Sequence, residues 1–502
     1  CSYITIGKET GSKPHSPDSG RTPPPHRRRP EGPFGRRCTV ANPEIQGERP
    51  WYRFYEPGVP RTLEFPAHPV YGFLDQSVSR YPDTIALIQA GPNFDRRITY
   101  SQLDDFSDRF AASLVRRGLR PGDRVAIILP NCPQFVIAAY GLWKAGGVLV
   151  QVNPLYRGRD LAFNLKDSGA RFAVGLSRLY KEVREVRPHT DLEAVVVTNL
   201  HDFFPTKFRL LYGLLKAKKE GDVMPREPGV IPFMEMLRGP RLDERPTVDP
   251  DGPAVLQYTG GTTGIPKAAV LTHRSLVCNC LQARHWLTDL KEGQERILSV
   301  TPFFHVYGMT ICMNLSVAIA ATNVMLLMRL FEAKTVAEAV PKYRPTVFPG
   351  VPAMYLAINN LREVEKYDLK SIRACVSGSA SLPVEVQRRF EELTGGRLVE
   401  GFGMSEASPL THANPIYGTR KAGSIGIPVP STDAKIVDLE TGARDLTPGD
   451  VGELVVRGPQ VMKGYWNNPA ETDKTIRRGW LFTGDIARMD EEGFFFIEDR
   501  KK

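Results

Sequence analysis

The sequence is poor in cysteine and in long hydrophobic runs. Seven cysteines are scattered through 502 residues, which excludes the disulfide-dense framework of a small secreted protein and favours a reducing cytosol. Cys278 and Cys280 are one residue apart without a Cys/His pair at finger spacing, so we expect no metal site there. The N-terminus lacks the basic-then-apolar run of a signal peptide.

The best candidate for a membrane span is the apolar stretch 311–328, which is long enough to cross a bilayer. It is interrupted by Asn314, Ser316, Thr322 and Asn323. These interruptions predict a buried helix followed by a buried strand at 323–328, and we expect no membrane span.

Length and charge set the broad class. A chain of 502 residues predicts two or more domains or subdomains, and 41% hydrophobic with 24% charged residues is typical of a soluble globular protein. Of the net charge of +10, residues 1–37 carry +5, from eight basic and three acidic residues. The rest is mildly basic, which weakly favours anionic substrates and argues against a nucleic-acid partner.

Residues 1–47 are rich in Pro, Arg, Ser and Gly and show no apolar period, so we expect a disordered basic tail. The chain begins with cysteine, so over-extension of the reading frame is one interpretation of this tail, and a basic tether is another.

From residue 100 we expect a helix at 100–117, a strand at 124–129, a helix at 135–145 and a strand at 148–152. This rhythm predicts a helix-covered parallel or mixed sheet.

The stretch 258–273 is the most informative in the chain. It carries Thr259, Gly260, Gly261, Thr262, Thr263, Gly264 and Lys267 between the apolar runs 254–256 and 268–271. Glycines let backbone N–H groups approach phosphate oxygens, threonine hydroxyls add donors, and the lysine adds a positive charge. Proline before the lysine and alanine after it exclude a Walker loop. A polyphosphate-binding loop is predicted, with a polar surface turn as the alternative.

Further segments downstream suit a nucleotide. Small residues at 377–383 follow the strand-like run 373–376, and small residues at a strand's carboxyl end let a flat ring approach the backbone. In segment 400–406, Glu406 offers a hard oxygen ligand for Mg²⁺. Asp485 follows a short apolar run, and its carboxylate can accept two hydroxyl donors. Each segment alone also fits an ordinary turn or core.

Together, these segments resemble the adenylate-forming enzymes, a superfamily of acyl-CoA synthetases, luciferases and peptide-synthetase adenylation domains. The resemblance runs in order from Trp51 to Lys502, and the opening 51–60 with 257–261 is most similar to bacterial long-chain fatty-acid CoA ligases. The departures from the family pattern are Gly261 for serine, Ala268 for glycine, Phe402 for tyrosine and Ser405 for threonine.

The resemblance implies a role for each matched position. Lys267, Thr262, Thr263, Glu406 and His305 would be catalytic, Glu406 would bind Mg²⁺, and Ser405 would face phosphate or carboxylate. The adenine and ribose would contact Gly378, Ser379, Ala380, Glu400, Gly401, Phe402, Gly403, Asp485 and Arg500. The acyl pocket would include Tyr307, Gly308, Gly350 and Val351.

The implied fold is α/β, the large N-terminal domain of adenylate-forming enzymes, with two helix-covered mixed or parallel sheet subdomains and a smaller β subdomain. The expected domains are the tail 1–47, an AMP-binding adenylation domain at 48–497 and a hinge at 498–502. Relatives continue into a C-terminal lid domain that carries a catalytic lysine. We therefore expect residues 1–502 to bind ATP but to turn over poorly alone.

The implied activity is ATP- and Mg²⁺-dependent conversion of a medium- or long-chain fatty acid to acyl-AMP, then to a thioester with coenzyme A. A fatty-acyl-AMP ligase, another carboxylic-acid adenylating enzyme and a non-catalytic nucleotide- or acyl-binding module stay open. The basic amphipathic segment 203–219 suggests peripheral contact at the inner face of the membrane, or a surface helix docked on its own protein. We otherwise expect a cytoplasmic location, and oligomeric state is left open.

Overall fold

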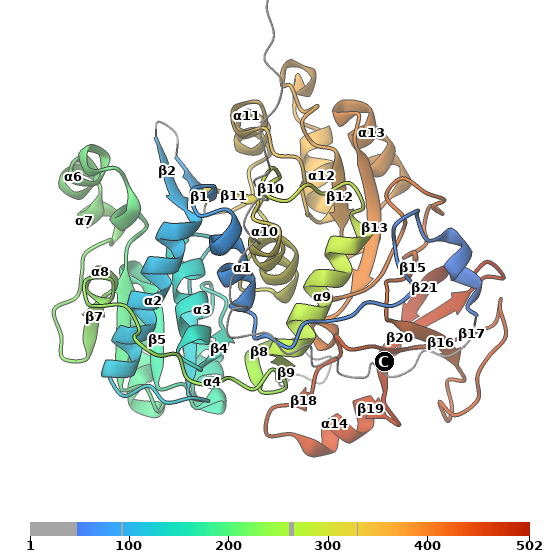
Figure 1. Cartoon of the computed structure of the whole chain (residues 1–502), viewed down its shortest axis with the longest axis horizontal. Coiled ribbons are helices and arrows are strands. Elements are labelled where there is room, and N and C mark those ends of the chain that lie inside the picture. The colour runs from blue at the N-terminus through green and yellow to red at the C-terminus, as the bar shows by residue number, and fades with distance from the viewer. Residues whose placement is uncertain (1–47, 92–93, 261–265, 329, 502) are drawn as a thin grey trace, which may run out of the picture. The chain divides into compact units, whose positions relative to one another are not determined.

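The computed structural model describes residues 48–91, 94–260, 266–328 and 330–501. The predicted tail 1–47 and four residues of the predicted phosphate loop, 261–264, lie outside this part of the chain. Figure 1 shows the arrangement of the elements.

The largest sheet has eight strands, most of them apolar and buried. Its order is β18 (Gly464–Tyr465), β9 (Lys267–Thr272), β8 (Pro253–Thr259), β4 (Val148–Gln151), β3 (Arg124–Ile128), β5 (Phe172–Leu176), β6 (Ala194–Thr198) and β7 (Val230–Pro232). Strands β8 to β7 pair in parallel, and β9 joins β8 as an antiparallel hairpin. Helix α3 packs against β3 and β4 of this sheet, and α2 packs beside α3 (Figure 1). The sequence expectation of a helix-covered mixed sheet is therefore confirmed.

Two four-stranded sheets are linked through Val347, which forms one bridge to Ile297 of the first sheet and one to Ala374 of the second. One has the order β10 (Arg296–Leu298), β11 (Thr322–Leu326), β1 (Ile85–Ala90) and β2 (Asp95–Thr99). The other has the order β12 (Ala374–Ser377), β13 (Arg397–Gly403), β14 (Leu410–Ala413) and β15 (Ile427–Pro428). Helix α13 packs on β13 (Figure 1).

The fourth sheet, of five strands, is antiparallel throughout, which is the expected β subdomain. It consists of β16 (Asp433–Val437), β17 (Val451–Arg457), β20 (Trp480–Met489), β19 (Ile476–Arg477) and β21 (Phe495–Arg500), which pairs with β20. Residues 498–500 of the predicted hinge lie in β21.

The described helices connect these sheets. The α-helices are α1 (Gly72–Arg80), α2 (Tyr100–Arg116), α3 (Pro133–Lys144), α4 (Gly158–Ser168), α5 (Tyr180–Val186), α6 (Thr206–Leu215), α7 (Ala217–Glu220), α8 (Phe233–Met236), α9 (His273–Trp286), α10 (Leu315–Ala318), α11 (Ala333–Tyr343), α12 (Pro352–Asn359), α13 (Val384–Thr394) and α14 (Pro469–Thr475). The short 3-10 helices are η1 (Pro50–Phe54), η2 (Ser177–Leu179), η3 (Arg187–His189), η4 (Leu200–Phe203), η6 (Val364–Lys366) and η7 (Ser405–Ala407), and η5 (Gly308–Asn314) is a π-helix.

Local signals explain several boundaries. Helix α2 begins at a capping box in which Thr99 and Gln102 satisfy each other's backbone N–H groups. The stretch 311–328 forms the end of η5, helix α10 and strand β11, all largely buried, as the sequence predicted. Within the described residues, no helix combines the length and apolar character that crossing a membrane requires.

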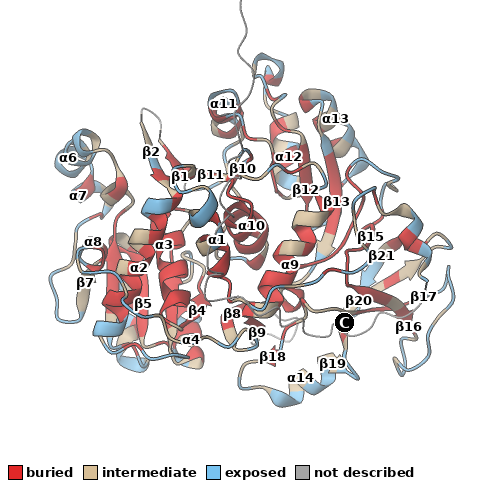
Figure 2. Cartoon of the chain, in the orientation of Figure 1, coloured by how far each residue is buried: buried red, intermediate tan, exposed pale blue. Residues whose placement is uncertain are grey.

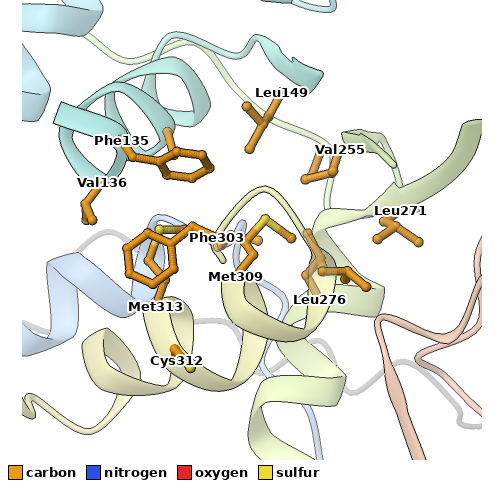
Figure 3. Packing of buried hydrophobic residues seen from close by; sticks show 14 of the residues in the cluster. Phe135, Val136, Leu149, Val255, Leu271, Leu276, Phe303, Met309, Cys312 and Met313 are labelled. Atoms are coloured by element: carbon orange, nitrogen blue, oxygen red, sulfur yellow. The ribbon is translucent and has the colours of Figure 1, made fainter. Parts of the chain in front are cut away.

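The hydrophobic core fills the space between the large sheet and the central helices. Phe303 lies 5.6 Å from Phe135 of α3, measured between ring centroids. Figure 3 shows Met309 and Met313 of η5 close to these two rings, with Leu276 of α9 nearby. All five side chains are buried, so the segment that leads into η5 is fixed by packing.

Candidate active site

The β8–β9 hairpin positions the lysine of the predicted phosphate loop. Thr259 and Lys267 are register partners at the loop end of the hairpin, and the Thr259 hydroxyl donates to the Lys267 carbonyl at 3.3 Å. Gly261, Thr262, Thr263 and Gly264 lie outside the described residues. Lys267, at the first position of β9, is only 19% exposed in its side chain.

The ammonium group of Lys267 has a defined partner. It lies 2.6 Å from the Glu471 carboxylate of α14 and 5.7 Å from the centroid of the Tyr465 ring. This ion pair, together with a weaker contribution from Lys474, holds the pKa of Glu471 below its usual range. The lysine is therefore directed toward the β18–α14 segment.

Glu406 lies in η7 and is buried. The Tyr465 hydroxyl donates to its carboxylate at 2.8 Å, and its backbone carbonyl accepts from the Met462 N–H at 2.7 Å. Burial, reinforced by this carboxylate, raises the pKa of Tyr465 well above the ordinary tyrosine value, so the hydroxyl stays a donor. Mg²⁺ at a nucleotide site is bound by one or two protein carboxylates together with phosphate oxygens. The Glu406 carboxylate is buried and held in a fixed orientation, so it fits that metal.

Asp485 and Arg500 face each other across the β20–β21 pair. They are register partners, and their side chains approach to 3.8 Å. Burial raises the pKa of Asp485, the Arg500 guanidinium opposes this, and the charges of Glu406 and Glu453 add to it. The two predicted ribose contacts are thus adjacent. The negative charge of Glu406 contributes to the raised pKa of Asp485.

A cavity of about 490 Å³ collects most of the remaining predicted residues. Its lining includes the predicted His305, Tyr307, Val351, Gly378, Ser379, Gly401, Phe402, Gly403 and Ser405. It also includes Thr301, Pro302, Val306, Met354, Val376, Met404, Pro409 and Leu410, which the sequence reasoning did not assign. Its walls come from the 301–307 loop, the start of α12 and the carboxyl ends of β12 and β13.

The loop that carries His305 is fixed by the half-buried side chain of Asn131. The Asn131 amide nitrogen donates to the carbonyls of Ser299 and Thr301 at 3.0 and 2.9 Å, and its oxygen accepts from the Phe303 N–H at 2.7 Å. His305 lines the cavity, where desolvation lowers its pKa below the ordinary value. We therefore infer a mainly neutral imidazole at pH 7, able to hydrogen-bond but not to supply a charge.

Some predicted residues lie outside the cavity lining. A Cβ on Gly308 would lie 2.1 Å from the Pro302 carbonyl oxygen, and one on Gly350 would lie 2.9 Å from the Tyr355 ring. Both glycines therefore permit close packing behind the cavity wall. Ala380 is exposed, beyond the end of β12.

Glu400 points into a different, smaller cavity of about 290 Å³, between α13 and the 420–424 loop. Its carboxylate accepts from the Leu382 N–H at 3.0 Å. Burial raises the pKa of Glu400 to about 7. The side chain is thus placed apart from the cavity lined by its neighbours Gly401 and Phe402.

Sequence reasoning missed Tyr465 and Glu471, which contact Glu406 and Lys267. Each is remote from its partner in sequence, by 59 and 204 residues respectively. The only local signal is that Asn468 and Pro469 mark the start of α14. That signal predicts a helix, but it does not predict that Glu471 of this helix contacts Lys267.

Comparison with known proteins shows the family of the chain. Residues 74–466 match the family described as AMP-binding enzyme. A long-chain-fatty-acid–CoA ligase of Bacillus subtilis is 42% identical over 461 residues, covering 91% of this chain and 81% of that protein. Its namesake in Escherichia coli O157:H7 is 37% identical over 458 residues, covering 90% and 80%.

A solved structure extends the match to the fold. The crystal structure of a long-chain-fatty-acid-CoA ligase from Archaeoglobus fulgidus superposes with a TM-score of 0.76 at 27% identity, covering 89% of this chain and 87% of that one. The sequence match and the structural match point to the same family. The chain belongs to the AMP-binding enzyme family.

Proposed function

We propose that the protein activates a medium- or long-chain fatty acid with ATP and transfers the acyl group to coenzyme A. The fatty-acid carboxylate oxygen attacks the α-phosphorus of ATP, and the bond to the β-phosphate breaks to release pyrophosphate. The coenzyme A thiol, losing its proton, then attacks the acyl carbon and displaces AMP. No general base is required in the first step, because a carboxylate is ionised at neutral pH.

One observation carries the proposal: the cavity lined by His305, Phe402 and Ser405 adjoins the side chains expected to hold the phosphates and the ribose. Ser405 precedes Glu406 in η7. Tyr465 contacts both Glu406 and Lys267. The names of the ligases from Bacillus and Escherichia support fatty acids over aryl or amino acids as substrates.

The proposed roles follow from charge and position. Lys267 neutralises phosphate charge, Asp485 and Arg500 hold the ribose, and Phe402 stacks on adenine. Glu406 would hold Mg²⁺, which supplies charge neutralisation on the phosphates when bound. The apolar walls at Val351, Met354 and Val306 accept the acyl chain near its carboxylate.

The test is fatty-acid-dependent pyrophosphate release with ATP and Mg²⁺, across short, long and aryl acids, with and without coenzyme A. Release that is greatest with long chains, together with acyl-CoA formation, supports the proposal. Release without a thioester would instead identify a fatty-acyl-AMP ligase. No release with any acid would leave the non-catalytic nucleotide- or acyl-binding module as the better account.

A second proposal concerns the surface formed by α6 and α7, which we call the α6 surface. Leu214 and Leu215 of α6 are 84% and 69% exposed, and Leu210 and Leu211 are exposed beside them. Figure 2 shows α6 largely in the exposed colour. The surface also carries Lys207, Arg209, Lys216, Lys218 and Lys219.

Exposed leucines among basic side chains suit the headgroup boundary of an anionic bilayer. We therefore propose peripheral contact with the inner face of the membrane, in a protein that is otherwise cytoplasmic. The five described cysteines are free thiols, which agrees with that compartment.

Flotation with anionic and with neutral vesicles tests the contact. The proteins compared are the wild type, the double variant Leu214→Ser/Leu215→Ser, and a control double variant on the exposed face of α11, Lys334→Ser/Glu338→Ser. Equal partition of the wild type and the leucine variant would contradict it.

A further inference from the structure

The segment from Met462 to Thr475 contacts both charged groups that the proposed function assigns to the ATP phosphates and their metal. Strand β18 pairs with β9, with Tyr465 opposite Ala269. This pairing places Tyr465 against Glu406 and directs α14 toward Lys267. The same segment is thus connected to the catalytic lysine and to the catalytic carboxylate.

Glu471 is held in place independently of Lys267. It is the third residue of α14, and its backbone N–H donates to the Asn468 side-chain oxygen that caps the helix at 3.1 Å. The Thr472 hydroxyl accepts from the Tyr465 N–H at 2.8 Å, which ties α14 to β18. The Glu471 carboxylate therefore contacts Lys267 from a helix whose backbone position does not depend on that contact.

We propose that Glu471 is a positioning residue that orients the Lys267 ammonium for the ATP phosphates. The inference rests on the proposed function, since it takes ATP as the ligand. A lysine ammonium has three N–H donors on a flexible four-carbon stem. Glu471 engages one donor at 2.6 Å, which leaves two for phosphate oxygens and orders the stem before ATP binds.

The opposite expectation is that Glu471 competes with ATP for Lys267. A carboxylate near a polyphosphate repels it, so on Coulomb grounds alone Glu471→Gln would tighten ATP binding. If ordering of the lysine dominates, the same substitution weakens binding. The sign of the change in affinity therefore distinguishes positioning from competition.

The experiment is calorimetric titration of the chain with ATP in the presence of Mg²⁺, for the wild type, Glu471→Gln and Glu471→Asp. We expect Glu471→Gln to weaken ATP binding about three- to tenfold. This factor corresponds to the free energy of immobilising one flexible side chain, which the variant would lose on binding ATP. Glu471→Asp keeps the charge on a shorter stem, so we expect it to restore part of the loss. Unchanged or tighter binding of ATP by Glu471→Gln would overturn the proposal.

A double-substitution cycle shows whether Glu471 acts through the lysine. In a Lys267→Met background, adding Glu471→Gln is expected to change ATP affinity less than twofold, because the positioned group is gone. An equal loss in both backgrounds would overturn the proposal. Lys474→Gln is the matched control: Lys474 lies 3.7 Å from Glu471, and its removal leaves the Lys267 pair intact, so affinity is expected to stay within twofold.

Failure of the inference is distinguishable from failure of the proposed function. If the wild type binds ATP and Glu471→Gln binds it equally well, only the positioning role is lost. If the wild type does not bind ATP with Mg²⁺, both are overturned. A thermal unfolding scan of each variant confirms that the compared proteins are folded, which is expected because the Glu471 side chain is 26% exposed.

Discussion

The hydroxyl of Tyr307 donates a 2.6 Å hydrogen bond to the backbone carbonyl of Val376, the third residue of β12. This bond links the loop that carries His305 to the strand whose end borders the proposed adenine site. The ring also packs against Gly378, where a Cβ would lie 3.3 Å from it. Tyr307 therefore sets the width of the cavity between that loop and β12.

Tyr307→Phe removes this bond without changing the ring. The Val376 carbonyl still accepts from the Gly350 N–H at 3.2 Å, so it is not left unsatisfied. We therefore expect a modest loss of about 1 kcal/mol in the free energy of unfolding, measured by urea denaturation. The control is Tyr367→Phe, since the Tyr367 hydroxyl makes no hydrogen bond to another described residue. A loss equal in both variants would contradict the assigned role.

Glu406→Gln removes the charge but keeps an oxygen that can accept from the Tyr465 hydroxyl. Stability is therefore expected to change little. Pyrophosphate release at saturating ATP and Mg²⁺ is expected to fall by about 100-fold or more, as when one preorganised electrostatic group is lost from an active site. Glu385→Gln, a charge-matched change on the exposed face of α13, controls for net charge. Retention of wild-type release by Glu406→Gln would contradict the role of Glu406 in the proposed chemistry.

Much of the fold was predictable because it is encoded locally. The helical spacing of Leu103, Phe110 and Leu114 predicted α2 to within a residue of its end, and the apolar run 124–129 predicted β3. The π-helix η5 was not predicted as such, because a hydrophobic pattern does not distinguish a π turn from an α turn within a buried segment.

Site residues were predictable only where several of them lie close together in one sequence motif. The predicted neighbours His305 and Tyr307 line the cavity together, as do several predicted residues of segment 400–406. The contacts of Tyr465 and Glu471 depend on the pairing of β18 with β9, in which Gly464 lies opposite Val270, about 190 residues earlier in the chain. Within the amphipathic segment 203–219, the rings of Phe208 and Tyr212 pack against Phe94 and His201, whereas Leu215 is exposed, a difference that the helical spacing alone does not show.

Gly308→Ala tests whether this glycine is required for packing. The new Cβ would lie 2.1 Å from the Pro302 carbonyl oxygen, at the entrance to η5. We expect a destabilisation of about 1–3 kcal/mol by urea denaturation, because the buried backbone on both sides must shift. The control is Gly213→Ala on α6, where nothing lies within 4 Å. It is expected to stabilise by about 0.5–1 kcal/mol. A neutral Gly308→Ala would contradict the close-packing interpretation.

Glu400 gives the fold a distinctive dependence on pH. Burial raises its pKa from 4.5 to about 7 in the folded protein, so between these values the folded state holds a proton that the unfolded state has released. Stability contributed by this group is therefore complete below pH 4.5, falls as the pH rises, and is level again above pH 7. The total loss corresponds to about 3 kcal/mol.

Glu400→Gln keeps an acceptor for the Leu382 N–H but carries no charge at any pH. Relative to the wild type, we expect the variant to gain stability as the pH rises from 5 to 8, by about 2–3 kcal/mol in the difference between the two proteins. Urea denaturation of both proteins at each pH measures this difference, and other titrating groups such as Asp485 cancel because both proteins contain them. Parallel stability curves would show instead that Glu400 is ionised in the folded state at no cost, and that the smaller cavity supplies a cationic or donor environment that offsets its burial.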